Sequence, residues 1–212
     1  MPASREIILS RIRKALKENP VEMPFPEAEK KNDIFPAAAA PPEELFAAAF
    51  NALGGRFVYC TGPLELCQQL EVLSDNLNWK KIHCRDRALL ELFKNHELDI
   101  VQEAGDMNDI EVGISLCEFA IARTGSLLVS AAQDSGRALP VYAPVHIAVV
   151  YSRQLVYDIA DAISGMKEKY GDQLPSMMAL TTGPSRTADI EKTLVVGVHG
   201  PKEVYVFLVD EP

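Results

Sequence analysis

Glycine, proline, hydroxyl and arginine residues coincide in one short segment, GPSRT at 183–187, directly after an apolar run at 177–180. A turn at the end of a strand directs several free backbone amides at one point, and an arginine adds a bidentate donor for a carboxylate or phosphate. Ser185 or Thr187 would cap a helix starting at Ala188-Asp189-Ile190-Glu191. The segment predicts an anion site, with plain helix capping as the alternative. The candidate ligand residues are Gly183, Ser185, Arg186 and Thr187.

A second candidate anion loop reads RTGS at 123–126 and separates two β-rich runs. Its bend, hydroxyl groups and arginine could face the same crevice as the first loop, although an ordinary hairpin turn explains the same residues. The candidate ligand residues here are Thr124, Gly125 and Ser126.

His199 lies in a tight turn, GVHGP at 197–201, where flanking glycines let the backbone approach a ligand. The alternative is a turn in which the glycines supply positive φ and His199 bonds to the backbone.

The 183–187 segment is also one residue short of a G-x-S-x-G nucleophile elbow, because Thr187 replaces the last glycine. Asp189, His199 and His146 could nominally complete a triad, but the spacing does not demand one. His146, at the start of an apolar run, is more typical of a core histidine than of a metal ligand.

The chain has 212 residues, 48% of them hydrophobic and 24% charged, with a formal net charge of −9. This composition excludes whole-chain disorder, and the charge argues against general nucleic-acid or membrane-surface binding. No nucleotide-binding glycine motif, zinc motif, calcium loop or iron–sulfur cysteine run occurs, so we expect no metal or cofactor in this chain. Four cysteines without a C-x-x-C pair, and no secretory leader or run of about 20 apolar residues, favour a cytoplasmic protein.

Two regions are predicted. Residues 1–42 comprise an amphipathic helix at 4–18, with a basic polar face, and a proline-rich strap; residues 43–212 form the main domain. A helix is expected from Pro41-Pro42 to Gly54-Gly55. Strands and helices then alternate, which predicts an α/β fold with a parallel-rich sheet and helices on both faces. Strands are expected at 56–60, 79–84, 98–102, 119–123, 126–131, 145–151, 177–180 and 204–209, and helices at 63–76, 85–95 and 153–169.

The runs ARTGSLLVSA (122–131), PVHIAVV (144–150), GPSRTADIE (183–191) and GVHGP (197–201) resemble the lactate-utilisation protein C family, the stand-alone LUD domain. The resemblance covers about residues 45 to 210. It implies a fold similar to the group of ribose-5-phosphate isomerase, glucosamine-phosphate deaminase and CoA transferases. It also implies a cytoplasmic role in oxidising L-lactate to pyruvate beside two partners that carry iron–sulfur clusters. Family members commonly have an acidic residue where this chain has Arg123.

Two functions are consistent with these residues. The first is a cluster-free accessory or substrate-handling subunit of an iron–sulfur system that oxidises lactate, binding a small carboxylate or phosphate between the Thr124 and Arg186 loops. The second is an independent enzyme of the same fold acting on an acyl-CoA or a phosphorylated small molecule. CoA transferases of this fold use a glutamate nucleophile, and Glu118 is the candidate here. A third possibility is a scaffold that docks a partner through residues 1–42.

Overall fold

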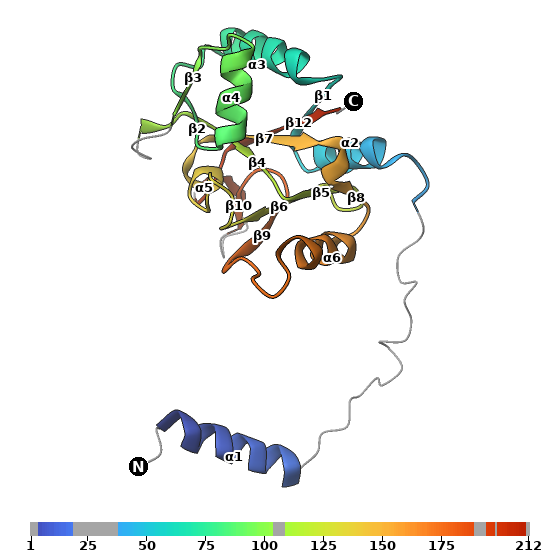
Figure 1. The fold of residues 1–212 in the computed structure, drawn as a ribbon, viewed down its shortest axis with the longest axis vertical. Coiled ribbons are helices and arrows are strands. Elements are labelled where there is room, and N and C mark those ends of the chain that lie inside the picture. Colours follow the sequence, from blue (N-terminus) through green and yellow to red (C-terminus); the bar gives the residue numbers. More distant parts are fainter. Residues whose placement is uncertain (1–3, 19–37, 104–108, 189–193, 198, 211–212) are drawn as a thin grey trace. The chain divides into compact units, whose positions relative to one another are not determined.

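A computed structural model describes residues 4–18, 38–103, 109–188, 194–197 and 199–210 (Figure 1). The chain divides into two compact units, residues 1–37 and 38–212. In the first, helix α1 (Ser4–Glu18) confirms the predicted amphipathic helix and has no buried residue. Its apolar side chains are open to solvent, with Ile8 57% and Leu16 62% exposed. Most of the predicted strap, residues 19–37, lies outside the described residues.

The second unit is built on a six-stranded sheet in the order β1-β12-β7-β4-β2-β3. All of its strand pairs are parallel. The prediction of a parallel-rich α/β fold is therefore confirmed. The strands are β1 (Arg56–Cys60), β2 (Ile82–Cys84), β3 (Val101–Glu103), β4 (Val112–Leu116), β7 (Val145–Tyr151) and β12 (Glu203–Val209).

Nearly every side chain of β7 and β12 is buried. Since successive side chains point to opposite sides of a sheet, both faces of these two strands are covered. Ile147 and Val149 belong to the core under helices α3 (Pro63–Leu77) and α4 (Arg87–Asn95). Ala148 and Val150 belong to a second core, which contains Phe46 and other side chains of helix α2 (Pro42–Ala52). Helices therefore cover both faces of the sheet.

A smaller sheet completes the second core, in the order β8-β5-β6-β9. The predicted bend at 124–125 joins β5 and β6 as an antiparallel pair. Helix α6 packs against β5 and β8. The remaining elements are β5 (Phe119–Ile121), β6 (Ser126–Ser130), α5 (Leu139–Tyr142), β8 (Leu155–Val156), α6 (Ile159–Tyr170), β9 (Met178–Thr181), β10 (Arg186–Ala188) and β11 (Leu194–Val196).

Several predicted boundaries are wrong, and one strand was not predicted. The strands expected at 79–84 and 98–102 begin at Ile82 and Val101. The helix expected from residue 153 begins at Ile159, because Asp158 caps it by accepting from the Ala160 N–H, and residues 152–156 form a turn and strand β8. Strand β4 was not predicted, because Gly113 and Ser115 interrupt its apolar run. Among the described residues, no helix combines the length and apolar character needed to cross a membrane.

Candidate functional site

The two predicted anion loops lie side by side at the end of the smaller sheet. Strands β6 and β9 pair antiparallel, with Leu127 opposite Thr181. One residue beyond this pair, the Ser126 and Thr182 hydroxyl oxygens are 2.9 Å apart. The bend at 124–126 and the turn at 183–185 are therefore neighbours.

Both loops pack against the carboxyl end of helix α2. A Cβ on Gly125 would lie 2.7 Å from the Phe50 nitrogen, and one on Gly183 would lie 3.1 Å from the Leu53 oxygen. The Arg186 guanidinium donates to the same Leu53 carbonyl. An arginine at this position satisfies a carbonyl that the helix leaves unpaired. Arg186 is thus held at the helix end, and its side chain is exposed.

The helix predicted to start at Ala188 is wrong at that residue, which belongs to a strand that starts at Arg186. This strand, β10, pairs antiparallel with β11, placing Arg186 opposite Val196. The β-branched residues Thr187, Val195 and Val196 favour this pairing. The anion-binding helix terminus expected from GPSRTADIE is therefore replaced by a hairpin at these positions. Asp189 and the rest of the predicted helix lie outside the described residues.

The GPSRT and GVHGP motifs contact each other directly. The Ser185 N–H donates to the Pro201 carbonyl at 2.9 Å, and the Gly197 N–H donates to the Ser185 carbonyl at 2.9 Å. A Cβ on Gly200 would lie 2.9 Å from the Ser185 Cβ, so only glycine allows this approach. Segments 183–187 and 197–201, which are separate in the sequence, therefore form one structure.

These two segments close a cavity of about 240 Å³, which we call the motif cavity. Of the predicted ligand residues, it brings together Gly183, Ser185 and His199. Thr124, Gly125, Ser126 and Arg186 are not among its described lining residues, and the side chain of Thr187 lies outside the described part of the structure. The lining residues are Pro140, Val141, His146, Thr181, Thr182, Gly183, Pro184, Ser185, His199, Gly200, Pro201 and Val204.

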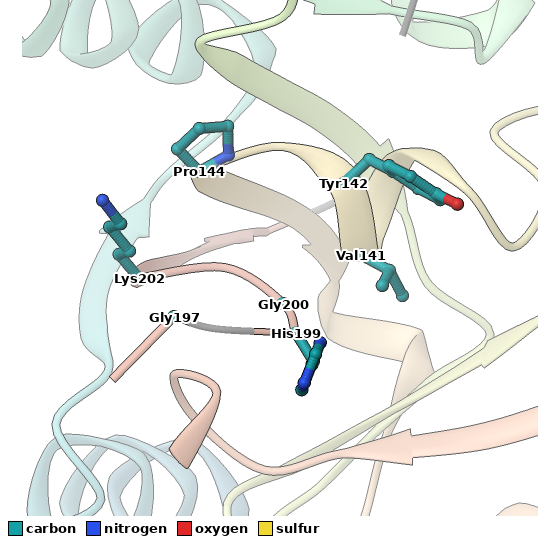
Figure 2. A pocket seen from close by; sticks show the side chains of 7 residues that line it. All are labelled: Val141, Tyr142, Pro144, Gly197, His199, Gly200 and Lys202. Atoms are coloured by element: carbon teal, nitrogen blue, oxygen red, sulfur yellow. The ribbon is translucent and has the colours of Figure 1, made fainter. Parts of the chain in front are cut away.

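A second cavity, of about 410 Å³, borders the GVHGP turn and shares Val141, His199 and Gly200 with the motif cavity (Figure 2). Figure 2 shows His199 on the side of Val141 and Lys202 on the side of Pro144. The ammonium group of Lys202 is the positive charge nearest in sequence to the motif. Lys202 directly follows GVHGP but was not predicted as a ligand residue.

The motif cavity is electrically neutral over its described lining, which contains no aspartate, glutamate, lysine or arginine. His146 is 1% exposed, and its Nε2 lies 2.9 Å from the Ser115 Oγ. Burial lowers the pKa of His146 to about 4, so its ring is uncharged at neutral pH. The cavity can therefore offer hydrogen bonds from hydroxyl and imidazole groups, but a full positive charge must come from its rim.

At the 123–126 bend, one side chain has a structural partner and another has none among the described residues. Arg123 pairs with Asp158 at 2.5 Å, at the start of α6, and this hydrogen bond lowers the pKa of Asp158. The Thr124 hydroxyl oxygen is buried without a hydrogen-bond partner among the described residues. Arg123 therefore joins the bend to the start of α6.

Glu118 lies apart from the motif cavity, with a side chain that is 0% exposed. Its carboxylate accepts from the Ser130 hydroxyl at 2.6 Å, the Tyr170 hydroxyl at 2.8 Å and the Lys169 ammonium at 2.8 Å. These three hydrogen bonds hold the Glu118 side chain in place, which leaves it little freedom to attack a substrate.

All four cysteines are buried and unbridged, and burial raises the pKa of each thiol. They therefore behave as small apolar residues, because reactive cysteines require accessible thiolate. Among the described residues, no group of three histidine, cysteine or acidic side chains could hold a metal ion.

Comparison with solved structures finds the same fold. A crystal structure of a DUF162 family protein from Deinococcus radiodurans superposes with a TM-score of 0.60 at 19% sequence identity, covering 82% of this chain and 99% of that one. Residues 11–209 match the LUD domain. The chain belongs to the LUD domain family.

Relatives with curated names are similar to part of the chain. "Lactate utilization protein C" of Bacillus licheniformis is 36% identical over 115 residues, which is 50% of this chain and 48% of that protein. The protein of the same name from Oceanobacillus iheyensis is 35% identical over 102 residues, or 47% and 44% of the two chains. The matched segments thus span about half the length of these relatives.

Proposed function

We propose that this LUD domain chain acts in lactate utilisation, as a cytoplasmic, cluster-free accessory or substrate-handling subunit that binds a small organic anion. Its membership of the LUD family and its similarity to proteins named "Lactate utilization protein C" support the process. The observation that supports binding of a ligand is the motif cavity, which is lined by residues of both GPSRT and GVHGP.

The size and lining of the motif cavity suit a three-carbon acid. At about 240 Å³ it is smaller than the usual range for drug-sized ligands. Pro184, Pro201 and Val204 offer apolar contacts for a methyl group. The Ser185 hydroxyl and the two imidazoles offer hydrogen bonds to oxygen atoms, and Lys202 or Arg186 at the rim supplies positive charge for a carboxylate.

Oxidation of lactate to pyruvate removes two electrons and two protons, so the reaction needs an electron acceptor. The proposal assigns this task to iron–sulfur partner proteins, with this chain binding the substrate or the product. In the alternative proposal the chain is an independent enzyme that acts on an acyl-CoA or phosphorylated compound. Assay of lactate-dependent dye reduction by the purified chain, with and without the partners, separates the two. Activity that requires the partners supports the first proposal, and turnover by the chain alone supports the second.

Binding is tested by NMR titration of the full chain with L-lactate and pyruvate, following the amides of Gly183 and Gly200. Loss of one neutral hydrogen bond costs about 1 kcal/mol, so Ser185→Ala should weaken binding about fivefold. Arg186→Ala and Lys202→Gln identify the charge that the carboxylate uses. His96→Gln, at the exposed end of α4, is the matched control and should bind as the wild type does. Equal affinity of the wild type and Ser185→Ala would remove the motif cavity from the proposal.

A further inference from the structure

A third cavity, of about 280 Å³, lies at the end of the parallel strands opposite to the motif cavity. It is lined by residues at or just beyond the carboxyl ends of β2, β4 and β7, whereas the motif cavity lies at the amino ends of β7 and β12. We call it the strand-end cavity. Ligands of open α/β sheets bind beyond the carboxyl ends of parallel strands, because the loops there diverge around a crevice. Its lining residues are Asp86, Leu116, Cys117, Ala132, Gln133, Asp134, Tyr151, Arg153, Gln154, Lys169 and Tyr170.

Side-chain hydrogen bonds fix the loops around the strand-end cavity. The Gln154 amide accepts from the Tyr151 N–H at 2.8 Å and donates to the Cys117 carbonyl at 2.6 Å. The Asp86 carboxylate accepts from the Leu116 N–H at 3.1 Å. The loops after β2, β4 and β7 are thereby tied to one another. Such bonds hold a site in shape before a ligand arrives.

Charges of both signs line this cavity. The positive charges are the ammonium of Lys169, which pairs with buried Glu118, and the guanidinium of Arg153, which lies 5.0 Å from the centre of the Tyr151 ring. The lining also contains the carboxylate of Asp86, which is only 3% exposed. Asp134 adds an exposed carboxylate that accepts from the Arg87 N–H at 3.3 Å. Mixed charges of this kind match a ligand that carries both an anionic group and a hydrogen-bond donor.

We propose that the strand-end cavity binds a small carboxylic acid with a hydroxyl or ammonium group on the adjacent carbon. Arg153 and Lys169 contact the ligand carboxylate, and the Asp86 carboxylate accepts from the hydroxyl or ammonium group. A carboxylic acid without a hydroxyl or ammonium group would donate no hydrogen bond to Asp86. Its own negative charge would then be repelled by the Asp86 carboxylate. Burial raises the pKa of Asp86, because the charged carboxylate loses contact with water. A hydrogen-bond donor from the ligand would offset this loss of hydration. The inference does not depend on the proposed lactate function, because the two cavities share no lining residue in the described part of the chain.

Three ligands with the same carbon skeleton test this inference. L-Lactate, L-alanine and propionate differ only in the group on the second carbon: hydroxyl, ammonium or hydrogen. The full chain is titrated with each ligand, and the amide shifts of Cys117 and Gln154 are followed by NMR. We expect lactate or alanine to bind at least about tenfold more tightly than propionate, since a donor to a charged acceptor is lost in propionate. The tighter of the two identifies the group that Asp86 recognises.

Variants locate the contacts. Arg153→Gln should weaken carboxylate binding at least about fivefold, and Asp86→Asn, which keeps the shape and an acceptor, should reduce the preference over propionate to less than about threefold. Lys167→Gln, exposed on the same helix as Lys169, is the matched control and should bind as the wild type does. Equal shifts with all three acids, no shifts with any of them, or an unchanged preference in Asp86→Asn would overturn the inference. Ser185→Ala should leave these shifts unchanged, so failure here is distinct from failure at the motif cavity.

Discussion

Replacing Gly125 by alanine tests whether the bend and helix α2 are held together by close backbone approach. Gly125 has φ +61°, in the left-handed region that favours glycine. Its added Cβ would lie 2.7 Å from the Phe50 nitrogen and 2.8 Å from the Ala49 carbonyl carbon. Both are backbone atoms, so the clash cannot be relieved by rotating a side chain.

The expected cost has two parts. An alanine in the left-handed region costs about 1 to 2 kcal/mol, and overpacking of a tight contact adds about 1 to 3 kcal/mol. Gly125→Ala should therefore lower the free energy of unfolding by about 2 to 5 kcal/mol. Displacement of the α2 end would also shift Leu53, which Arg186 contacts.

A second glycine provides the matched control. Gly136 has φ +58°, but a Cβ there meets nothing within 4 Å. Gly136→Ala should therefore show the backbone cost alone, about 1 to 2 kcal/mol. Urea unfolding of both variants measures the difference, which we expect to be about 1 to 3 kcal/mol. Equal destabilisation of the two variants would refute the close approach of the bend and α2.

The remaining predictions concern buried ionisable groups. Because the pKa of His146 falls from 6.5 to about 4 on folding, the unfolded chain takes up a proton below pH 6.5 that the folded chain excludes. Stability should therefore be lost as the pH falls, by about 2 kcal/mol between pH 7 and pH 5, and urea titrations at both values should show a smaller loss in His146→Gln. Lys169→Met removes one of the three donors to buried Glu118 and should cost about 1 to 2 kcal/mol, less than for a fully buried pair because Lys169 is 56% exposed. Lys167→Met should change stability by less than about 0.5 kcal/mol, and an equal loss in both lysine variants would contradict the role of the ion pair.

Local patterns were sufficient for most of the six-stranded sheet. The apolar runs at 145–151 and 204–209 predict its two buried strands, and they become β7 and β12. The run at 112–116 was missed because Gly113 lowers its strand character. Only packing explains that glycine, since a Cβ there would lie 2.9 Å from the Ala143 Cβ beside α5.

The sequence by itself determined the alternation of strands and helices, the family motifs and the residues within each turn, because these depend on neighbours along the chain. Tertiary structure decided where the turns face. Arg186 contacts the end of α2, and Ser185 packs directly against Gly200 beside the motif cavity. The strand-end cavity joins residues as distant as Asp86 and Tyr170. The order of strands in the sheet sets these neighbours, and a local pattern of residues does not encode that order.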